Sequence, residues 1–363
     1  MSAARPVYIR RIAHVSALGL CATEAARTLR AGRRNLSEHT LHGETWPWFA
    51  LPFAEENWTV RARRALNLLA TELADGKPPS ALGHLPLFVG SSANGTGAIE
   101  AAARIAGSTD ISADDTVVLN QEIRLAFGCD AAPWMFSTAC TSGLAALEAA
   151  FTLIAQGEIN EAIVLGADFA STTALAGFSS LGLLARTPKA NGLILGEAAA
   201  GMLLTTRPGS GWRIAACRMG IDGHSPTLPA PDGHPIAANI AAALDDAKLA
   251  ASQIDFIKPH RGGLAGIDDA ENAALNIVFG TNRPLERPIK HQIGHTLGAS
   301  GPAEITALLA QSDQSGACSP QRLLFSFAGF GGSMAAVIIE RCPAPESGSE
   351  KTAPPPFLGG ISG

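Results

Sequence analysis

One cysteine stands at the junction between a predicted strand and a predicted helix. Cys140 follows the short β-favouring run that begins at Trp134, and an apolar helical pattern begins at the next residue, Thr141. The unpaired N–H groups and the positive dipole end of that helix would favour a thiolate over a thiol. The N–H groups of the same turn could also bind a developing oxyanion. Residue type and position therefore predict that Cys140 is a nucleophile.

Three later segments place polar or glycine-rich loops directly after predicted strands. In open α/β sheets, ligands bind beyond the carboxyl ends of the strands. We therefore expect these loops to meet Cys140 in one site. The segments are Lys258–Gly263, with Asp268 and Glu271 beyond it; Lys290–Gly301, which contains His291 and His295; and Phe327–Ser333.

Composition limits the class of protein. Apolar residues make up 47% of the 363 residues and charged residues only 16%, with 38 glycines, which indicates a tightly packed α/β chain and no general disorder. The net charge of −5 gives no overall reason to expect nucleic acid binding. No unbroken apolar run reaches the roughly 18 residues of a membrane span. The six cysteines are too sparse for a disulfide scaffold and form no C-x-x-C pair, so we expect a cytoplasmic protein without a metal site.

Strands and helices are predicted to alternate in two halves, which favours a layered α/β fold. We expect an N-terminal half at residues 1–185, a C-terminal half at 186–342 and a disordered tail at 343–363. Residues 46–48 are predicted to be irregular. The predicted strands are 8–15, 85–90, 162–166, 193–205, 212–218, 254–259, 288–290, 323–327 and 335–340. The predicted helices are 24–31 (capped by Thr23), 58–74, 97–106, 115–127, 141–154, 236–247, 268–279 and 299–311.

Four motifs, in order and in spacing, resemble the elongating Cys-His-His type of β-ketoacyl-acyl-carrier-protein synthase. The resemblance extends from Tyr8 through Glu340 and implies a thiolase-like fold, in which two similar βαβ halves form alternating αβαβα layers. The motifs are Cys140 in T-A-C-T-S-G, His260 eight residues before Asp268, Lys290 five residues before His295 in G-H-T-L-G-A-S-G, and G-F-G-G at 329–332.

The resemblance also implies a role for each site residue. Cys140 would take an acyl group from a phosphopantetheine arm on an acyl carrier protein, and a malonyl-type thioester would then lose CO2 and attack that group. His260 and His295, as neutral imidazoles, would donate hydrogen bonds to the thioester oxygen. The arm is part of the substrate, so no separate cofactor is expected. The N–H groups of Cys140 and Phe330 would form the oxyanion hole, Phe330 would gate the acyl pocket, and Lys290 and Glu271 would be an ion pair that orients the histidines. Apart from the resemblance, the position of Asp268 predicts that it caps the helix that begins there.

The resemblance further implies two kinds of partner. An arginine-rich helix at this position docks the acidic carrier protein in the family, and Arg63 and Arg64 are the candidates here. A solvated helix face is the alternative reading of this cluster. The family implies a dimer, either of two copies or with another ketosynthase-like subunit.

Several positions depart from the family pattern. This chain has His-Arg-Gly-Gly-Leu at 260–264 where the family has His-Gly-Thr-Gly-Thr, and Ala328 replaces an aromatic residue. The stretch at 186–191 is short and lacks the family's aspartate and arginine. We therefore expect altered binding of the pantetheine arm and a divergent, compact acyltransferase of fatty-acid, polyketide or polyene biosynthesis. A non-catalytic subunit that shapes the acyl tunnel of a heterodimer and a cysteine-dependent acyltransferase without decarboxylation are the alternatives.

Overall fold

The strands form one ten-stranded mixed sheet built from two equivalent halves. The computed structural model describes residues 4–41, 43–53, 57–106, 117–208, 211–314 and 321–342, so the predicted tail at 343–363 lies outside the described residues. The strand order is β10-β9-β11-β12-β8-β1-β7-β6-β4-β5. The strands are β1 Val7–Ser16, β4 Leu87–Gly90, β5 Trp134–Phe136, β6 Glu161–Asp168, β7 Ala198–Thr205, β8 Trp212–Ile221, β9 Phe256–Lys258, β10 Leu285–Glu286, β11 Arg322–Ala328 and β12 Ser333–Arg341.

The two halves have the same internal pairing. In the first half, β1 pairs antiparallel with β7 and β7 with β6, while β6, β4 and β5 are parallel. In the second half, β8 pairs antiparallel with β12 and β12 with β11, while β11, β9 and β10 are parallel. The antiparallel pair β1–β8 joins them. Because β7 belongs to the first half, the boundary expected at residue 185 falls before the last strand of that half.

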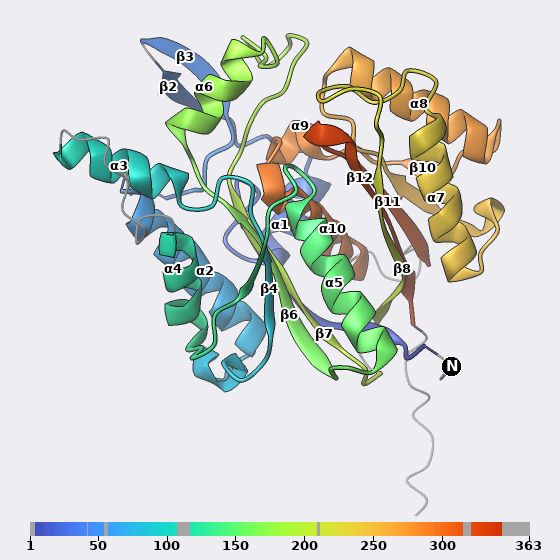
Figure 1. Cartoon of the computed structure of the whole chain (residues 1–363), viewed down its shortest axis with the longest axis horizontal. Helices are drawn as coiled ribbons and strands as arrows, with labels where there is room; N and C mark the ends of the chain where they lie inside the picture. Colours follow the sequence, from blue (N-terminus) through green and yellow to red (C-terminus); the bar gives the residue numbers. More distant parts are fainter. Residues whose placement is uncertain are drawn as a thin grey trace, which may run out of the picture.

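Helices cover both outer faces of the sheet and fill the space between its halves (Figure 1). α2 and α4 pack on the outer face of the first half, and α7 and α8 on that of the second. α5 and α10 lie between the halves within the largest apolar core. This is the expected αβαβα layering. The helices are α1 Ala22–Arg30, α2 Trp58–Ala74, α3 Thr96–Ala106, α4 Val118–Phe127, α5 Ser142–Gln156, α6 Thr172–Ser180, α7 His234–Ala247, α8 Ala265–Phe279, α9 Lys290–Ile293 and α10 Ser300–Asp313.

Helix α2 shows why its predicted bounds were correct. The Asn57 side chain accepts a hydrogen bond of 3.1 Å from the Val60 N–H and so caps the helix, as short polar residues do. Asp75 ends the helix in the left-handed conformation at φ 51°. Leu66, Leu69 and Leu73 are fully buried along one stripe. The N-cap residue, the left-handed residue at the C-terminus and the apolar stripe are all local features. The sequence alone therefore specifies helix α2.

Three other local predictions were wrong. Thr23 does not cap the first helix, because α1 begins at Ala22 and its N-cap residue is Cys21. Glu72 of α2 instead accepts a bond of 2.8 Å from the Ala22 N–H. The short strand expected at 288–290 is absent there, and the helix α9 begins at Lys290. The stretch around Trp46 is a regular hairpin of β2 (Ser37–Leu41) and β3 (Glu44–Trp48).

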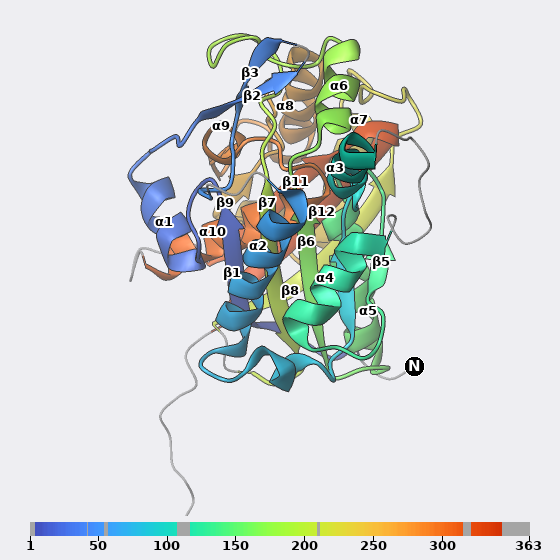
Figure 2. The same ribbon diagram turned by 90° about the vertical axis from the view of Figure 1, so that its left-hand side faces the viewer.

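The β2–β3 hairpin and α6 form a cap at one end of the sheet, at the top of Figure 1 and of Figure 2. Trp46 and Trp48 are buried on one face of the hairpin, with Leu175 of α6 in the same apolar cluster. Leu297, which follows His295, belongs to this cluster, and Phe330 packs against it. The cap therefore forms the apolar side of the region where the predicted catalytic loops end.

Helix α5 is unusually apolar. The segment Ala139–Gln156 has a mean hydropathy of 1.2 over 18 residues, which is long and apolar enough to cross a membrane, although Glu148 and several other polar residues interrupt it. Half of this segment is buried inside the fold. Leu144, Leu147 and Ile154 are fully buried in the core between the two sheet halves. Packing in that core explains the apolar composition of α5.

Candidate active site

Cys140 lies in the turn between β5 and α5, as predicted. The strand ends at Phe136, Thr141 is the N-cap residue of α5 and the helix begins at Ser142. Ala139 has a φ of 51°, a conformation that is uncommon for a residue with a side chain. The Ser142 hydroxyl holds this turn by accepting from the Thr138 N–H at 3.0 Å and donating to the Ala139 carbonyl at 2.6 Å. The turn presents the cysteine at the N-terminus of a buried helix.

The expectation of a resting thiolate at Cys140 was wrong. The residue is only 5% exposed. Burial raises the pKa of the Cys140 thiol to about 11, although hydrogen bonds from the Phe330 N–H and from its own N–H, and the charge of Lys290, all act to lower it. Desolvation of the thiolate therefore outweighs the helix terminus, and the resting sulfur carries its proton at neutral pH. The two N–H groups expected to form the oxyanion hole do meet at this sulfur.

His260 follows β9 directly and is 3% exposed. Its backbone N–H donates to Glu271 at 2.7 Å, and its ring Nδ1 accepts from the Ala328 N–H at 3.2 Å. Burial, followed by the charge of Lys290, lowers the pKa of His260 well below its ordinary value. The ring is therefore neutral, and because Nδ1 is an acceptor, the proton resides on Nε2.

His295 is fixed in the same way from a different part of the chain. Its backbone N–H donates to the Ile194 carbonyl at 2.8 Å, and its Nδ1 accepts from the Leu297 N–H at 3.1 Å. Leu297 takes the left-handed φ of 52° that this contact requires. Burial, with a smaller contribution from Lys290, lowers the pKa of His295 to about 3. His295 is also a neutral imidazole with its proton on Nε2.

The two imidazoles lie beside each other. Their ring centroids are 5.9 Å apart and the rings are inclined at 68°. This separation is short enough for two Nε2–H groups to reach one oxygen atom. Two neutral donors that lie in a buried environment can stabilise negative charge as it develops on that oxygen. The two histidines, which are distant in the sequence, therefore lie side by side as predicted.

The predicted ion pair between Lys290 and Glu271 is not formed. Lys290 instead forms a salt bridge with Glu304 of α10, which was not predicted as a site residue. Glu271 accepts hydrogen bonds from the N–H groups of His260 and Arg261 and from the Ser326 hydroxyl at 2.8 Å. Glu271 therefore positions the His260 loop through the backbone. A glutamate within the otherwise uncharged helix predicted at 299–311 was the available signal for Glu304.

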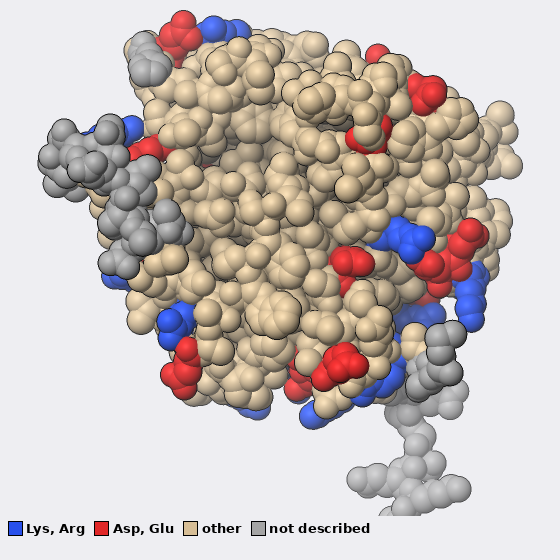
Figure 3. Space-filling model, viewed as in Figure 1, with Lys and Arg blue, Asp and Glu red and all other residues tan. Residues whose placement is uncertain are grey.

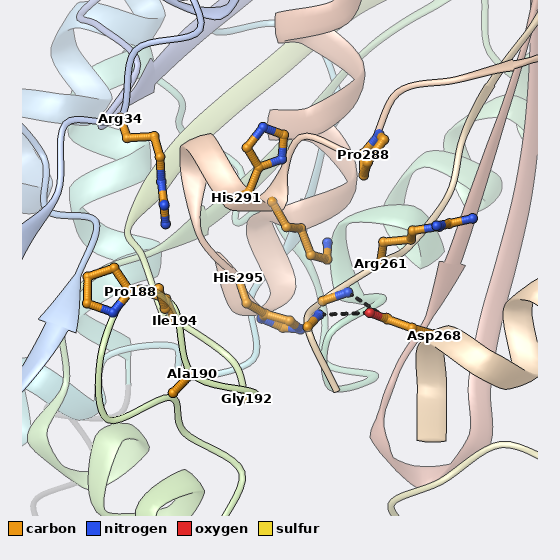
Figure 4. Close-up of a pocket in the computed structure, with 13 residues that line it drawn as sticks. Arg34, Pro188, Ala190, Gly192, Ile194, Arg261, Asp268, Pro288, His291 and His295 are labelled. Atoms are coloured by element: carbon orange, nitrogen blue, oxygen red, sulfur yellow. Dashed lines mark hydrogen bonds between the residues drawn. The ribbon is translucent and has the colours of Figure 1, made fainter. Parts of the chain in front are cut away.

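Asp268 does not act as a helix cap, because α8 begins earlier, at Ala265, and Asp268 lies in its first turn. Its carboxylate accepts from the N–H groups of Gly262 and Gly263, at 3.0 and 3.2 Å. Arg261, at φ 29°, extends away from these glycines (Figure 4). It forms a salt bridge with Glu286. Asp268 and Arg261 thus fix the loop at 261–263 through contacts with α8 and β10.

A second carboxylate that sequence reasoning missed lies behind the cysteine. Asp168, at the end of β6, is 1% exposed. It accepts from the Ser91 hydroxyl at 2.7 Å and from the Gly298 N–H at 2.7 Å. It also accepts from the N–H groups of Ser92 and Ala93. Asp168 therefore joins the loop after β4 to the segment that follows His295.

Phe330 lies where a gate would have to act. The residue is half-buried, and its ring centroid is 5.4 Å from that of Phe178 of α6. Phe178 lies 6.2 Å from the His295 ring. A Cβ placed on Gly329 would lie 3.5 Å from the Cys140 Cβ, so the loop before Phe330 passes directly over the cysteine. The two aromatic rings separate the buried site from the apolar cap.

A pocket of about 280 Å³ opens beside His295. Figure 4 shows Arg34 and His291 on one side of it and Ile194 and Gly192 on another. Lys290 and the Arg261–Gly263 loop also contribute to its wall. The described residues that line this pocket do not include Cys140. The pocket thus reaches one imidazole directly, and access to the sulfur requires a further movement.

The predicted docking arginines of α2 are placed differently from one another. Arg63 forms two hydrogen bonds of 2.7 Å with Glu122 of α4, so its charge is largely compensated. Arg64 is exposed, and its guanidinium lies 4.4 Å from the centre of the Phe53 ring. Arg61, their neighbour, is 12% exposed and pairs with the buried Glu197 at 2.6 Å. Arg63 and Arg64 are therefore both exposed on the surface of α2, whereas Arg61 is largely buried.

Sequence comparison places both halves of the chain in one family. Residues 64–208 match the family profile described as "Beta-ketoacyl synthase, N-terminal domain", and residues 213–316 match "Beta-ketoacyl synthase, C-terminal domain". A 3-oxoacyl-[acyl-carrier-protein] synthase 2 of Mycobacterium leprae is 33% identical over 199 residues, which are 49% of this chain and 47% of that protein. Polyketide synthase GfsB of Streptomyces halstedii is 32% identical over 209 residues, 52% of this chain and 4% of that much longer protein. The match thus spans about half of the first relative and a small part of the second.

Solved structures agree on the fold. A β-ketoacyl synthase from Burkholderia phymatum STM815 superposes with a TM-score of 0.76 at 23% identity, over 93% of this chain and all of that chain. A chain of the complex between the ketosynthase ApeO and its chain length factor ApeC from Xenorhabdus doucetiae gives a TM-score of 0.79 at 21% identity, over 93% and 98% of the two chains. With the profile matches over both halves, these similarities show that the chain is a member of the β-ketoacyl synthase family and has its thiolase-like fold.

Proposed function

We propose that this protein is a decarboxylating β-ketoacyl-acyl-carrier-protein synthase. The observation that carries the proposal is the state of the two histidines. Both rings are buried and neutral, and backbone N–H groups occupy both Nδ1 atoms, so both Nε2–H groups remain as donors. A simple acyl transfer to cysteine needs no such pair, whereas an enolate needs donors at its oxygen.

The first half-reaction transfers an acyl group to Cys140. The sulfur bonds to the acyl carbonyl carbon, the bond to the pantetheine sulfur breaks, and the proton of the Cys140 thiol ends on the pantetheine sulfur. The N–H groups of Cys140 and Phe330 stabilise the oxyanion formed on the way. Because the sulfur is buried, Phe330 has to move before the thioester can reach it.

The second half-reaction forms the carbon–carbon bond. The bond to the carboxylate of a malonyl-type thioester breaks, CO2 leaves, and the electron pair remains as an enolate held by His260 and His295. The enolate carbon bonds to the acyl carbonyl, the bond to Cys140 breaks, and the released thiolate takes a proton from water. The pocket beside His295 is where the extender thioester would enter, next to Gly262, which stands in place of the first of the family's two threonines.

A decarboxylation assay tests this function. Purified protein is mixed with acyl-carrier protein and carboxyl-labelled malonyl-carrier protein, and labelled CO2 and β-ketoacyl product are measured together. We expect both, in equal amounts. Acyl loading without CO2 would indicate a plain acyltransferase. Absence of both from the protein alone, with recovery only beside a catalytic ketosynthase, would indicate a tunnel-shaping partner subunit, a role compatible with the burial of Cys140.

We further propose that α2 docks an acidic carrier protein through Arg64. Reversing this charge, in Arg64→Glu, should raise the KM for acyl-carrier protein about two- to five-fold, since a single rim charge contributes at most about 1 kcal/mol. The kcat should be unchanged, and so should the rate with a small acyl-pantetheine thioester. The experiment measures KM at low and high salt. An equal loss with the small thioester would contradict docking and indicate a structural role for α2.

We also propose that β5 pairs with a second subunit, either another copy or a ketosynthase-like partner. β5 is an edge strand with Trp134 59% and Met135 38% exposed. Unpaired strand edges with large apolar side chains are sites of association. β5 and α5 lie on the right-hand side of Figure 2. This side of the molecule is the face that points toward the viewer in Figure 1. Figure 3 shows that charged side chains lie mainly toward the rim of this face and that its middle is uncharged.

Trp134→Glu should convert the dimer into a monomer, because it places a charge in the apolar centre of the proposed interface. The measurement is the molar mass by light scattering after size exclusion. Leu125→Glu, at an apolar residue of α4 that is 70% exposed, is the matched control and should leave the dimer intact. A wild-type monomer that also fails to bind a ketosynthase-like subunit would contradict the proposal, as would a Trp134→Glu dimer.

A further inference from the structure

We propose that Lys258 is a positioning residue of the condensing reaction: its buried ammonium, held by Glu304, balances the carboxylates beside the two imidazoles while negative charge forms between them. The inference rests on the proposed function and adds a residue to it. Nothing in the sequence motifs singles out Lys258, which precedes Pro259 and His260 at the end of β9.

Lys258 is fully buried within a cluster of charges contributed by different elements. Its Nζ lies 2.7 Å from the Glu304 Oε2 of α10, and both side chains are 0% exposed. The same Nζ lies 3.4 Å from the centre of the Phe327 ring of β11. Lys290 of α9 forms a salt bridge with the other oxygen of Glu304. One carboxylate thus bridges two ammonium groups, and an aromatic face covers the first of them.

The charge balance of this cluster explains what Lys258 does. The ionisable groups that face it are Glu304, Lys290, Glu271 of α8, and the rings of His260 and His295. Burial raises the pKa of Glu271, while hydrogen bonds from the His260 N–H and the Ser326 hydroxyl and the charge of Lys258 favour its ionised form. With both carboxylates ionised and both rings neutral, two positive charges face two negative ones. Without Lys258, one ammonium would face two buried carboxylates beside a reaction that creates a further negative charge. The expected consequence is a higher barrier to decarboxylation, with little effect on transfer of an acyl group to Cys140.

Keeping this ammonium buried is unfavourable in itself. Burial lowers the pKa of Lys258 to about 8, with Lys290 acting in the same direction and Glu304 opposing both. The positive charge of Lys258 in turn helps to lower the pKa values of His260 and His295. Perturbed ionisable groups of this kind are concentrated at functional sites. A neutral side chain of similar length would fill the same space without the desolvation cost.

The pKa of Lys258 gives the proposal a measurable signature. As the pH rises through about 8, Lys258 loses its charge, and decarboxylation should fall with it. The histidines do not titrate in this range, since both pKa values lie below the ordinary one, and the pKa of Cys140 is about 11. An alkaline limb near pH 8 in the rate of CO2 release would therefore report on Lys258.

The test compares Lys258→Met with Lys258→Arg in separate assays of CO2 release and of acyl loading. Lys258→Met should lower CO2 release about tenfold or more at pH 7, by analogy with the loss of other site charges, while acyl loading stays within about threefold. Its residual activity should lack the limb near pH 8. Lys258→Arg should keep the charge at all accessible pH values, restore CO2 release and remove the limb, because guanidinium does not deprotonate.

Acyl loading separates this role from a loss of folding. Lys258→Met should melt at a lower temperature than wild type, because it leaves one ammonium facing two buried carboxylates, yet at a temperature where it is folded it should still load an acyl group. Equal CO2 release by Lys258→Met and wild type would overturn the proposal, as would a wild-type profile without a limb near pH 8. Because the pH profile of CO2 release is measured on the wild-type protein, it tests the role of Lys258 even if neither variant folds. Absence of CO2 release from wild type at every pH would instead reject the proposed function itself.

Discussion

Replacement of Cys140 by alanine is expected to abolish acyl loading and to lower condensation by at least about 10⁴-fold, the usual scale for loss of a nucleophile. The sulfur lies under Gly329, and the N–H groups of Cys140 and Phe330 are directed at it, so no other thiol can take its place. The measurement is the mass of the intact protein after incubation with acyl-carrier protein. The substitution removes one sulfur from a buried turn and should not unfold the protein.

Cys21→Ala is the matched control for this substitution. Cys21 is partly exposed and precedes α1, where its side chain makes no capping hydrogen bond. The variant should load and condense like wild type. An acyl mass that persists on Cys140→Ala would place the nucleophile elsewhere and would contradict the assignment.

Replacement of either histidine by alanine is expected to lower CO2 release by about 10²- to 10³-fold, the range measured when one oxyanion donor is lost. Acyl loading should stay within a few-fold of wild type, because it uses the N–H groups of Cys140 and Phe330. His260→Gln should retain more activity than His260→Ala, since the glutamine amide can place a donor near the position of Nε2. Single-turnover assays of loading and of CO2 release measure the two steps separately.

The pH profile gives a second check on the histidines. Both pKa values are lowered, so the rings stay neutral as the pH falls through 6.5, and CO2 release should not fall there. His291→Ala is the control, because His291 is exposed at the edge of the same pocket. Equal losses of loading and of CO2 release in the histidine variants, or a steep fall near pH 6.5, would contradict the role of neutral donor.

The sequence predicted the elements of the site better than the contacts within it. Cys140 and His260 each follow a strand, whereas His295 follows the short helix α9, and all three were located because they belong to motifs with fixed spacing. The loss of the predicted Lys290–Glu271 pair has a tertiary cause: α10 brings Glu304 between Lys290 and Lys258. No spacing rule connects residues on β9, α9 and α10.

Burial was the other source of error. The helix terminus predicted a thiolate at Cys140, yet the loop at Gly329 and the neighbouring core exclude water from the sulfur and reverse the direction of the pKa shift. The hairpin at 37–48 was missed because it contains Pro47 within a strand, where proline is disfavoured except at edges. Among the described strands, this hairpin pairs with no other sheet, so Pro47 is tolerated there.

The most direct test of the account follows the mass of the protein through one cycle. Incubation with acyl-carrier protein should add one acyl group to the Cys140 peptide, and subsequent malonyl-carrier protein should remove that mass as CO2 and a β-ketoacyl product appear. A protein that gains no acyl mass, or an acyl-enzyme that survives the addition of malonyl-carrier protein without releasing CO2, would contradict it.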